Sequence, residues 1–460
     1  MGHFFAHQLA AAVERGEVPM SRLDDMCRRI VAPALTLETP EATAGSGQAG
    51  PPLDVERSLA AAETIACRSM VVLSNDGVLP LDPEQPRSLL LVGANADRAV
   101  LSGAGSAAVH PRGGDPVNPP DLPYNAFSRV TWVPSSPLDA LRQALPRWQV
   151  EYVAADDLEA VLGAARDADI VVVMATQHTS EGRDMPDLHL PDEQDALIDA
   201  VVEVNNDVLV VLQTGGPVYT PWARRVRAVV EAWYPGHRGG EALASVLTGI
   251  VNPSAKLPVT FPADPSQLVR SGPPAVPMKP GRTRPDRVPP HGDFSWVDLP
   301  FQVEYDEPVG YQRYDVRALT PAFPFGHGLS YTSFDYAGLT VGVTDDQLTV
   351  RFEVTNTGQR DGTEIGQVYA GLPSSLDEPP LRLVGWAVLP TTAGSTEQAE
   401  VVIPVKRVAT WDIELHRWVI TPGRYTLRVG RSSRDLPLSV EIDLEAAALP
   451  TLAEARHVQA

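Results

Sequence analysis

The sequence predicts an α/β layered domain, with a mostly parallel sheet and helices on both faces, followed by an all-β sandwich of the immunoglobulin or fibronectin III type. Three observations predict this fold class. Short β-branched runs alternate with helix-like segments between residues 54 and 262. From residue 331 to about residue 446 the pattern changes to strands with apolar–polar alternation, separated by turn sequences. Residues 263–330, between them, are rich in proline and show no periodicity, which is typical of an irregular connector.

The composition excludes several classes of protein. The chain has 460 residues, of which 43% are hydrophobic and 21% charged, so two or three domains with apolar cores are expected. The net charge of -21 argues against a protein that binds nucleic-acid backbones. No apolar run reaches the roughly 18 residues that a membrane span needs. The two cysteines, Cys27 and Cys67, lie in helix-like apolar patterns, and we expect two buried thiols.

The first 53 residues are predicted to be a helical segment and a linker. Residues 1–37 read as two helices, the first ended by Gly16 and the second capped by Ser21 with Asp24. Residues 38–53 are rich in glycine, proline, alanine and threonine, as linkers are. No basic region followed by an apolar run marks a signal peptide, so a cytoplasmic location is expected.

The α/β domain is predicted over residues 54–262. A long helix, Val55–Leu73, is expected first, and further helices at 192–205 and 239–247. The strands are apolar almost throughout, as expected when helices cover both faces of a parallel sheet. They are predicted at Ser88–Val92, Ile170–Met174, Val208–Leu212 and Ala228–Ala232.

The sandwich is predicted over residues 331–446, and residues 447–460 are expected to form a tail. Turn sequences such as that at 356–358 separate its strands. These strands are predicted at Leu348–Val354, Ile365–Ala370, Glu400–Ile403, Tyr425–Val429 and Ser439–Ile442.

A polar loop that follows the strand Ile170–Met174 is the best candidate for chemistry. Sites in α/β domains lie at the carboxyl ends of strands, and this loop carries Glu181. A carboxyl group there could act as a general acid if its surroundings raised its pKa toward neutrality. On spacing alone, an ordinary solvated loop residue is the better interpretation.

Other candidate motifs fail on context. The run Ser102-Gly103-Ala104-Gly105-Ser106 suggests a dinucleotide-binding loop, but ten residues separate it from the preceding strand and the third glycine is missing. His178 and His189 flank Glu181 without completing a metal-ligand set, and Ser180 lacks a nucleophile-elbow pattern. No cofactor and no metal site are expected.

Many short motifs, in order along about four fifths of the chain, resemble those of family 3 glycoside hydrolases, a group that includes many β-glucosidases. Those of the C-terminal α/β domain lie at 74–81, 92–97, 105–107, 180–184, 214–218, 233–236, 239–240 and 252–262. Those that lead into and through the fibronectin-like domain lie at 323–331, 354–358, 361–364 and 385–386.

The resemblance implies a retaining double displacement on a β-glucoside or a related oligosaccharide or aryl glycoside. In that mechanism an aspartate on an N-terminal (β/α)8 barrel attacks the anomeric carbon, and a glutamate on the α/β domain is the acid/base. By position the glutamate corresponds to Glu181, within a supporting loop of Gly182, Arg183 and Asp184. Met185 stands where the family usually has arginine.

The family's nucleophile is not found in this sequence. It lies in an Asp-Trp dipeptide, whereas none of the eight tryptophans here follows an aspartate. Residues 9–30 resemble the last helices of the barrel, so the chain is expected to begin near the end of that domain. A barrel-bearing chain or a homo-oligomer could then be its partner. The alternative is a non-catalytic remnant that binds carbohydrate or a protein partner.

Overall fold

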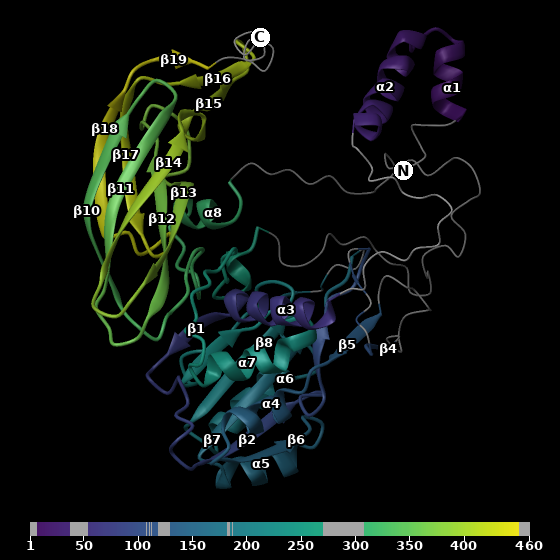
Figure 1. Ribbon diagram of the computed structural model, residues 1–460, viewed down its shortest axis with the longest axis vertical. Helices are drawn as coiled ribbons and strands as arrows, with labels where there is room; N and C mark the ends of the chain where they lie inside the picture. The colour runs from purple at the N-terminus through teal and green to yellow at the C-terminus, as the bar shows by residue number, and fades with distance from the viewer. Residues whose placement is uncertain are drawn as a thin grey trace. The chain divides into compact units, whose positions relative to one another are not determined.

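The computed structural model describes the chain in two units. The larger unit holds the α/β domain and the sandwich, and the smaller one holds the helices α1 (His7–Glu14) and α2 (Met20–Thr36) (Figure 1). The described residues are 7–36, 54–106, 108, 109, 111, 113–117, 129–181, 185, 187–269 and 308–449.

The helices α1 and α2 lie within the segment that was predicted to be helical. Gly16, at φ +75°, follows the first helix, and glycine suits that left-handed conformation. Cys27 lies on α2 and is exposed, so the prediction of two buried thiols was wrong for it and right for Cys67. None of the described residues of α2 is buried, so the helix has no enclosed face in which Cys27 could lie.

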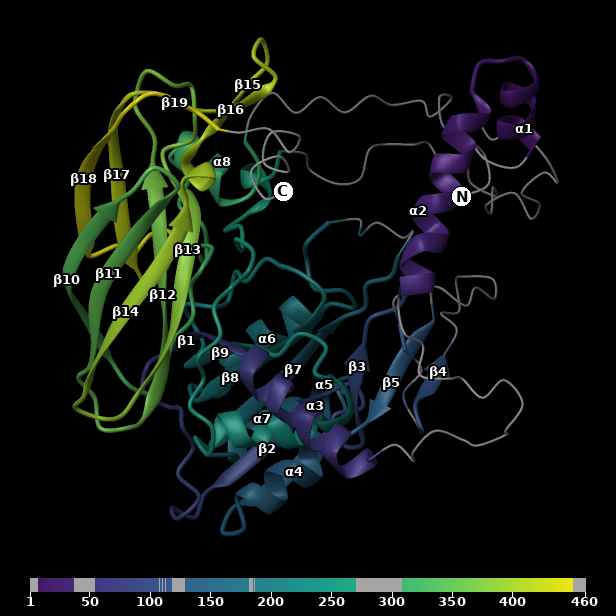
Figure 2. The same ribbon diagram turned by 45° about the horizontal axis from the view of Figure 1, so that its top comes forward.

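A six-stranded sheet of order β1-β9-β8-β7-β2-β6 forms the centre of the α/β domain (Figures 1 and 2). The strands from β9 to β6 run parallel, and β1 pairs antiparallel with β9 at one edge. The strands are β1 (Val71–Asn75), β2 (Ser88–Gly93), β6 (Gln149–Val153), β7 (Ile170–Gln177), β8 (Val208–Thr214) and β9 (Ala228–Glu231). The predicted α/β layer is confirmed.

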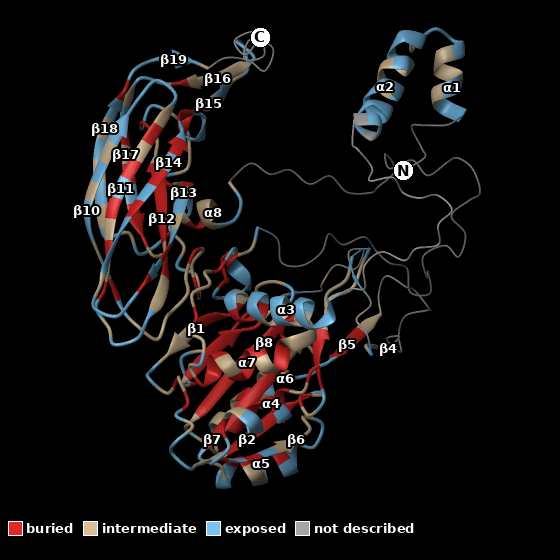
Figure 3. Ribbon diagram, in the orientation of Figure 1, coloured by how far each residue is buried: buried red, intermediate tan, exposed pale blue. Residues whose placement is uncertain are grey.

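Helices cover both faces of this sheet, because successive side chains of a strand point to opposite sides. In β7, Val172 packs on one face and Val171 and Val173 on the other. One face is covered by α3 (Val55–Ser69), α4 (Pro137–Ala144) and α7 (Gly239–Leu247), and the other by α5 (Leu158–Asp167) and α6 (Gln194–Val202). Figure 3 shows the resulting buried core in the strands.

The helix predicted over Val55–Leu73 is shorter than expected. It ends at Ser69, and the apolar run that follows forms β1, in which Val71 pairs with Glu231 and Val72 with Val230. Met70, Val71 and Val72 are completely buried. The β-branched residues therefore gain sheet pairing and burial that a further helical turn would not provide.

The sandwich packs two antiparallel sheets, β10-β11-β14 and β13-β12-β17-β18, around one apolar core. Every second side chain of β11 is buried, from Leu348 to Asn356, which is the alternation of a strand with one solvent face. All five predicted strands lie within observed ones, and β10 and β13 are additional. The strands are β10 (Phe334–Val343), β11 (Gln347–Asn356), β12 (Gly362–Gly371), β13 (Arg382–Thr391), β14 (Thr396–Pro404), β17 (Gly423–Gly430) and β18 (Leu438–Leu444).

Two smaller three-stranded sheets and several short helices complete the described chain. One sheet has the order β3-β5-β4 and the other β15-β16-β19. Their strands are β3 (Ala99–Ser102), β4 (Asp115–Val117), β5 (Val130–Pro134), β15 (Thr410–Asp412), β16 (Arg417–Ile420) and β19 (Ala447–Ala448). The helices are α8 (Tyr311–Val316) and the 3-10 turns Gly236–Arg238, Pro265–Gln267 and Val405–Val408. Over the described ranges, we find no helix with the length and apolarity of a membrane span.

Candidate active site

The carboxyl ends of β7, β8 and β9 meet at one edge of the sheet, because these neighbouring strands are parallel. The segment Thr179–Glu181 follows β7, Gly215 follows β8, and Tyr234 comes shortly after β9. The glycine-rich run that begins at the end of β3 joins them, since Ala104 forms a parallel bridge with Ser180.

Glu181 lies against this glycine-rich run. The backbone N–H of Ala104 donates to the carbonyl of Thr179 at 3.0 Å, and the N–H of Ser106 donates to Oε2 of Glu181 at 2.6 Å. A Cβ at Gly105 would lie 2.7 Å from Cβ of Glu181, closer than side chains pack. The run interpreted above as a failed dinucleotide motif is therefore the support of the candidate acid/base.

The carboxyl group of Glu181 is exposed, and its hydrogen bonds favour the ionised form. The side chain of Ser106, and then its backbone N–H, hold the pKa of Glu181 below the ordinary value, because both bond to the carboxylate. At neutral pH this group is an ionised base. Acting as a general acid requires surroundings that exclude water and raise the pKa.

Tyr234 has a hydroxyl with every hydrogen-bonding position in use. It lies 2.6 Å from the carbonyl oxygen of Gln177, which can only accept, so the single hydroxyl proton of Tyr234 is donated there. The hydroxyl then accepts from both the N–H and the Oγ1 hydroxyl of Thr179, each at 2.9 Å. Burial raises the pKa of Tyr234, which keeps the phenol protonated.

Glu231, the last residue of β9, is a fully buried carboxyl group. Its Oε1 accepts from the N–H of Trp233 at 2.7 Å, and its Oε2 lies 3.0 Å from Oγ1 of Thr214. The hydroxyl of Thr214 also lies 2.7 Å from the carbonyl of Gly216, which can only accept. The Thr214 hydroxyl has a single proton. If it donates that proton to the Gly216 carbonyl, its contact with Glu231 requires a proton on the Glu231 carboxyl group. Burial raises the pKa of Glu231 well above its ordinary value, in agreement with a neutral acid.

Of the predicted acid/base and its supporting loop, together with Met185, the structure describes Glu181 and Met185. Gly182, Arg183 and Asp184 lie outside the described residues. Sequence reasoning missed two residues of this edge as functional candidates. Glu231 could have been noticed as an acid within an otherwise apolar strand, and Tyr234 only as part of a family motif.

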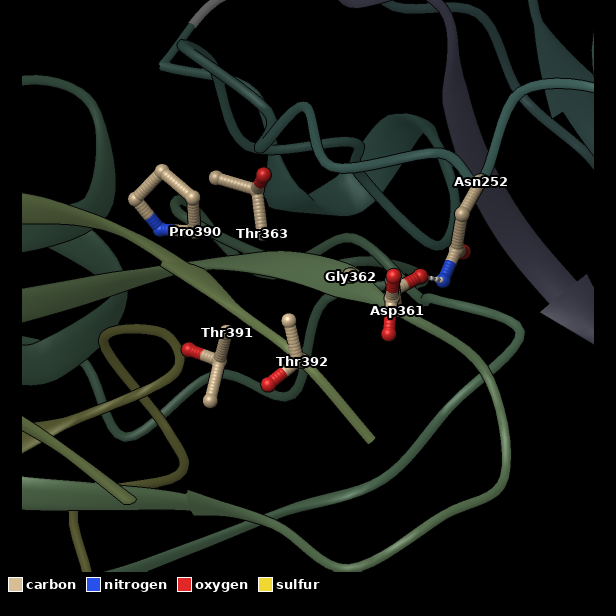
Figure 4. A pocket seen from close by; sticks show the side chains of 7 residues that line it. All are labelled: Asn252, Asp361, Gly362, Thr363, Pro390, Thr391 and Thr392. Atoms are coloured by element: carbon tan, nitrogen blue, oxygen red, sulfur yellow. Dashed lines mark hydrogen bonds between the residues drawn. The ribbon is translucent and has the colours of Figure 1, made fainter. Parts of the chain in front are cut away.

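The pocket in Figure 4 lies elsewhere, between the α/β domain and the sandwich. Nδ2 of Asn252 donates to the carbonyl of Asp361 across it, at 2.9 Å. Its lining residues are Asn252, Asp361, Gly362, Thr363, Pro390, Thr391 and Thr392. Among the residues with described positions, no three histidine, cysteine or acidic side chains gather closely enough to hold a metal ion.

Two family models match the chain. The glycosyl hydrolase family 3 C-terminal domain matches residues 70–331, and the fibronectin type III-like domain matches residues 364–433. The first match spans more than half of the chain and includes β1 to β9 with the glycine-rich run and Glu181.

Curated relatives are β-glucosidases. A β-glucosidase of Rhizobium radiobacter is 36% identical over 68% of this chain and 37% of its own length. Thermostable β-glucosidase B of Acetivibrio thermocellus is 31% identical over 83% of this chain and 48% of its own length. The chain thus spans between about a third and a half of these relatives.

Solved structures show the same fold. The β-D-glucoside glucohydrolase of Trichoderma reesei is 28% identical, with a TM-score of 0.73 over 96% of this chain and 63% of its own. A β-glucosidase of Streptomyces venezuelae, solved with D-glucose, is 26% identical, with a TM-score of 0.77 over 96% of this chain and 66% of its own.

Proposed function

This chain belongs to glycosyl hydrolase family 3, and on that premise we propose that it supplies the acid/base half of a retaining β-glucosidase-type site, with Glu181 as the acid/base residue. The observation that carries the proposal is the position of Glu181. Its exposed carboxyl group lies at the edge of the sheet where the parallel strands end, and the glycine-rich run holds it through the N–H of Ser106. The substrate would be a terminal β-glucoside or a related oligosaccharide or aryl glycoside.

Glu181 would act twice in such a reaction. It first donates a proton to the departing glycosidic oxygen while a carboxylate nucleophile bonds to the anomeric carbon. It then removes a proton from the water that breaks the glycosyl–enzyme bond. The nucleophile would come from a barrel-bearing chain or domain, with the two carboxyl groups about 5 Å apart.

The lowered pKa of Glu181 suits the second role but opposes the first. A barrel placed over this edge would exclude water, and a sugar and a second carboxylate would add to the cost of the ionised form. We therefore expect the pKa of Glu181 to rise when the partner and substrate are bound. The chain alone is expected to be incompetent.

The test is hydrolysis of β-glucosides by the chain mixed with a separately produced family 3 barrel domain. Glu181→Gln should lower kcat/KM for an alkyl β-glucoside by about 10²–10⁴-fold, the usual contribution of a general acid. The loss in the glycosylation step should be much smaller for a 2,4-dinitrophenyl glucoside, because that leaving group departs without a proton.

Glu159→Gln, an exposed change in the first turn of α5, is the matched control and should leave both rates unchanged. Equal losses for the two leaving groups would contradict the acid role. Robust turnover by the chain without a barrel, abolished by Glu181→Gln, would contradict the expectation that the nucleophile lies elsewhere.

The second candidate is a non-catalytic protein that binds sugar or a partner, and the exposed, ionised state of Glu181 favours it. Calorimetry with glucose and oligoglucosides distinguishes the two. Heat of binding to the chain alone, without any turnover on addition of a barrel domain, would support the binding function. No heat at millimolar ligand would count against it.

A further inference from the structure

We propose that Tyr234, held in place by Glu231, is a positioning residue for the segment that carries Glu181. Its consequence for catalysis rests on the function proposed above for Glu181. The positioning itself follows from contacts at the carboxyl edge of the sheet and can be measured without turnover.

The first step is the set of hydrogen bonds by which Tyr234 holds the end of β7. Its hydroxyl donates to the carbonyl of Gln177 and accepts two hydrogen bonds from Thr179, so one oxygen bonds to the chain on both sides of His178. Three bonds to a single, partly buried oxygen leave the end of the strand little freedom to rotate. Glu181 follows two residues after Thr179.

The second step is steric. A Cβ at Gly103 would lie 2.8 Å from the ring of Tyr234, and a Cβ at Gly215 would clash with Oγ1 of Thr179 and the Tyr234 ring. The backbones of two loops therefore pack directly on the phenol and on Thr179. Such close approach is possible only for glycine.

The third step is the anchoring of Tyr234 itself. Trp233 has a positive φ of +54°, an uncommon conformation for a large side chain, and its N–H is bonded by Glu231. The other oxygen of Glu231 contacts Thr214, which precedes Gly215. One buried carboxyl group thus holds both the turn that carries Tyr234 and the turn that packs on it.

The last step connects Thr179 with Glu181. The carbonyl of Thr179 accepts from Ala104, and Ser106, two residues further on, donates to the Glu181 carboxylate. The distance between the Ser106 nitrogen and Glu181 Oε2, 2.6 Å, depends on both segments staying in register. Loosening Thr179 should therefore weaken the bond that lowers the pKa of Glu181.

The experiment compares Tyr234→Phe with Tyr425→Phe in the 460-residue chain. Tyr425 is the control, since its hydroxyl also donates to one backbone carbonyl, that of Thr421 in the sandwich, and its side chain is buried. The carboxyl carbon of Glu181 is followed by NMR in glutamate-labelled protein, its signal being assigned by its loss in Glu181→Gln. Amide exchange is followed at Thr179 and Ser106.

In Tyr234→Phe the titration midpoint of Glu181 should rise toward its ordinary value, and the Thr179 amide should exchange about tenfold faster. The Ser106 amide should also exchange faster. Tyr425→Phe should change none of the three. If Tyr234→Phe does not fold, Thr179→Val removes one donor to the same oxygen and should raise the same midpoint.

An unchanged Glu181 midpoint and Ser106 exchange in folded Tyr234→Phe, or in Thr179→Val, would overturn the proposal. So would equal changes in Tyr425→Phe, because they would reflect a general loss of stability. None of these readouts needs activity. A failure of Glu181 as an acid/base would instead appear only in the leaving-group comparison with the barrel domain.

Discussion

Glu231 is a carboxyl group without access to water, and its neighbours determine its charge. A neutral acid can accept from Trp233 and donate to Thr214, and glutamine can do the same with its carbonyl and amide groups. We predict that Glu231→Gln changes the free energy of unfolding little below pH 4.5, where the natural side chain is protonated in the folded and the unfolded chain alike. Glu231→Ala should lower it by about 1–3 kcal/mol, because two buried polar groups lose their partner. Urea unfolding monitored by circular dichroism measures both.

A second prediction concerns how the stabilities of the natural chain and of Glu231→Gln depend on pH. The pKa of Glu231 in the fold lies above its ordinary value of 4.5. The stability that depends on this proton is complete below that ordinary value and is lost as the pH rises toward the folded pKa. Glutamine has no proton to lose. The stability of Glu231→Gln relative to the natural chain should therefore increase as the pH rises above 4.5. An unchanged relative stability above pH 4.5 would show that Glu231 is ionised in the fold.

The segment from the end of β3 to Ser106 keeps its conformation only with glycine at position 105. Gly105 has φ +123° and its Cβ position is blocked by Glu181, so Gly105→Ala combines strain with a clash. We predict a loss of more than about 1 kcal/mol in unfolding free energy, and a displaced Glu181 seen as a shifted titration midpoint.

Gly163 is the control for this change, because it lies within α5 and a Cβ there would meet nothing within 4 Å. Gly163→Ala should stabilise the chain by about 0.5–1 kcal/mol, since alanine restricts the unfolded chain and favours helix. Thermal unfolding of the two variants side by side checks the contrast. A stabilising Gly105→Ala would contradict the tight packing at the candidate site.

At the scale of the whole molecule, a buried ion pair links the α/β domain with the sandwich. Nζ of Lys256 lies 3.0 Å from Oε1 of Glu364 on β12, and the two side chains are 10% and 3% exposed. Lys256 also donates to the carbonyl of Gly328 at 2.9 Å, and the hydroxyl of Tyr336 donates to Glu364. Both charges are thus satisfied only while the two domains stay together.

We predict that Lys256→Met costs about 3–5 kcal/mol, because it leaves Glu364 buried and unpaired. The double variant Lys256→Met/Glu364→Gln should recover part of that loss, since no isolated charge remains. Calorimetry should show one unfolding transition for the natural chain and a separated transition of the sandwich in Lys256→Met. Additive losses in the double variant would show that the pair is not coupled.

The repeating patterns were readable without a structure. The apolar runs of β2, β7, β8 and β9 and the alternation in β11 mark strands, because burial on two faces or on one face leaves a direct trace in the sequence. The C-terminal end of α3 could not be predicted from the sequence, because Val71 and Val72 suit a helix or a strand until β9 is available as a partner. The candidate acid/base was found only through ordered motifs, since an exposed loop carboxylate has no periodicity.

The sequence by itself determined the fold class, the order of the two domains and the choice of Glu181, because local periodicity and short ordered motifs carry that information. Only the tertiary structure decided what surrounds Glu181. Ser106, 75 residues away in the sequence, bonds to its carboxylate. Tyr234 bonds to Thr179, two residues before Glu181, and Glu231 bonds to the turn that carries Tyr234. The pKa of a carboxyl group depends on such neighbours, so the lowered pKa of Glu181 and the raised pKa of Glu231 follow from the fold and not from their places in the chain.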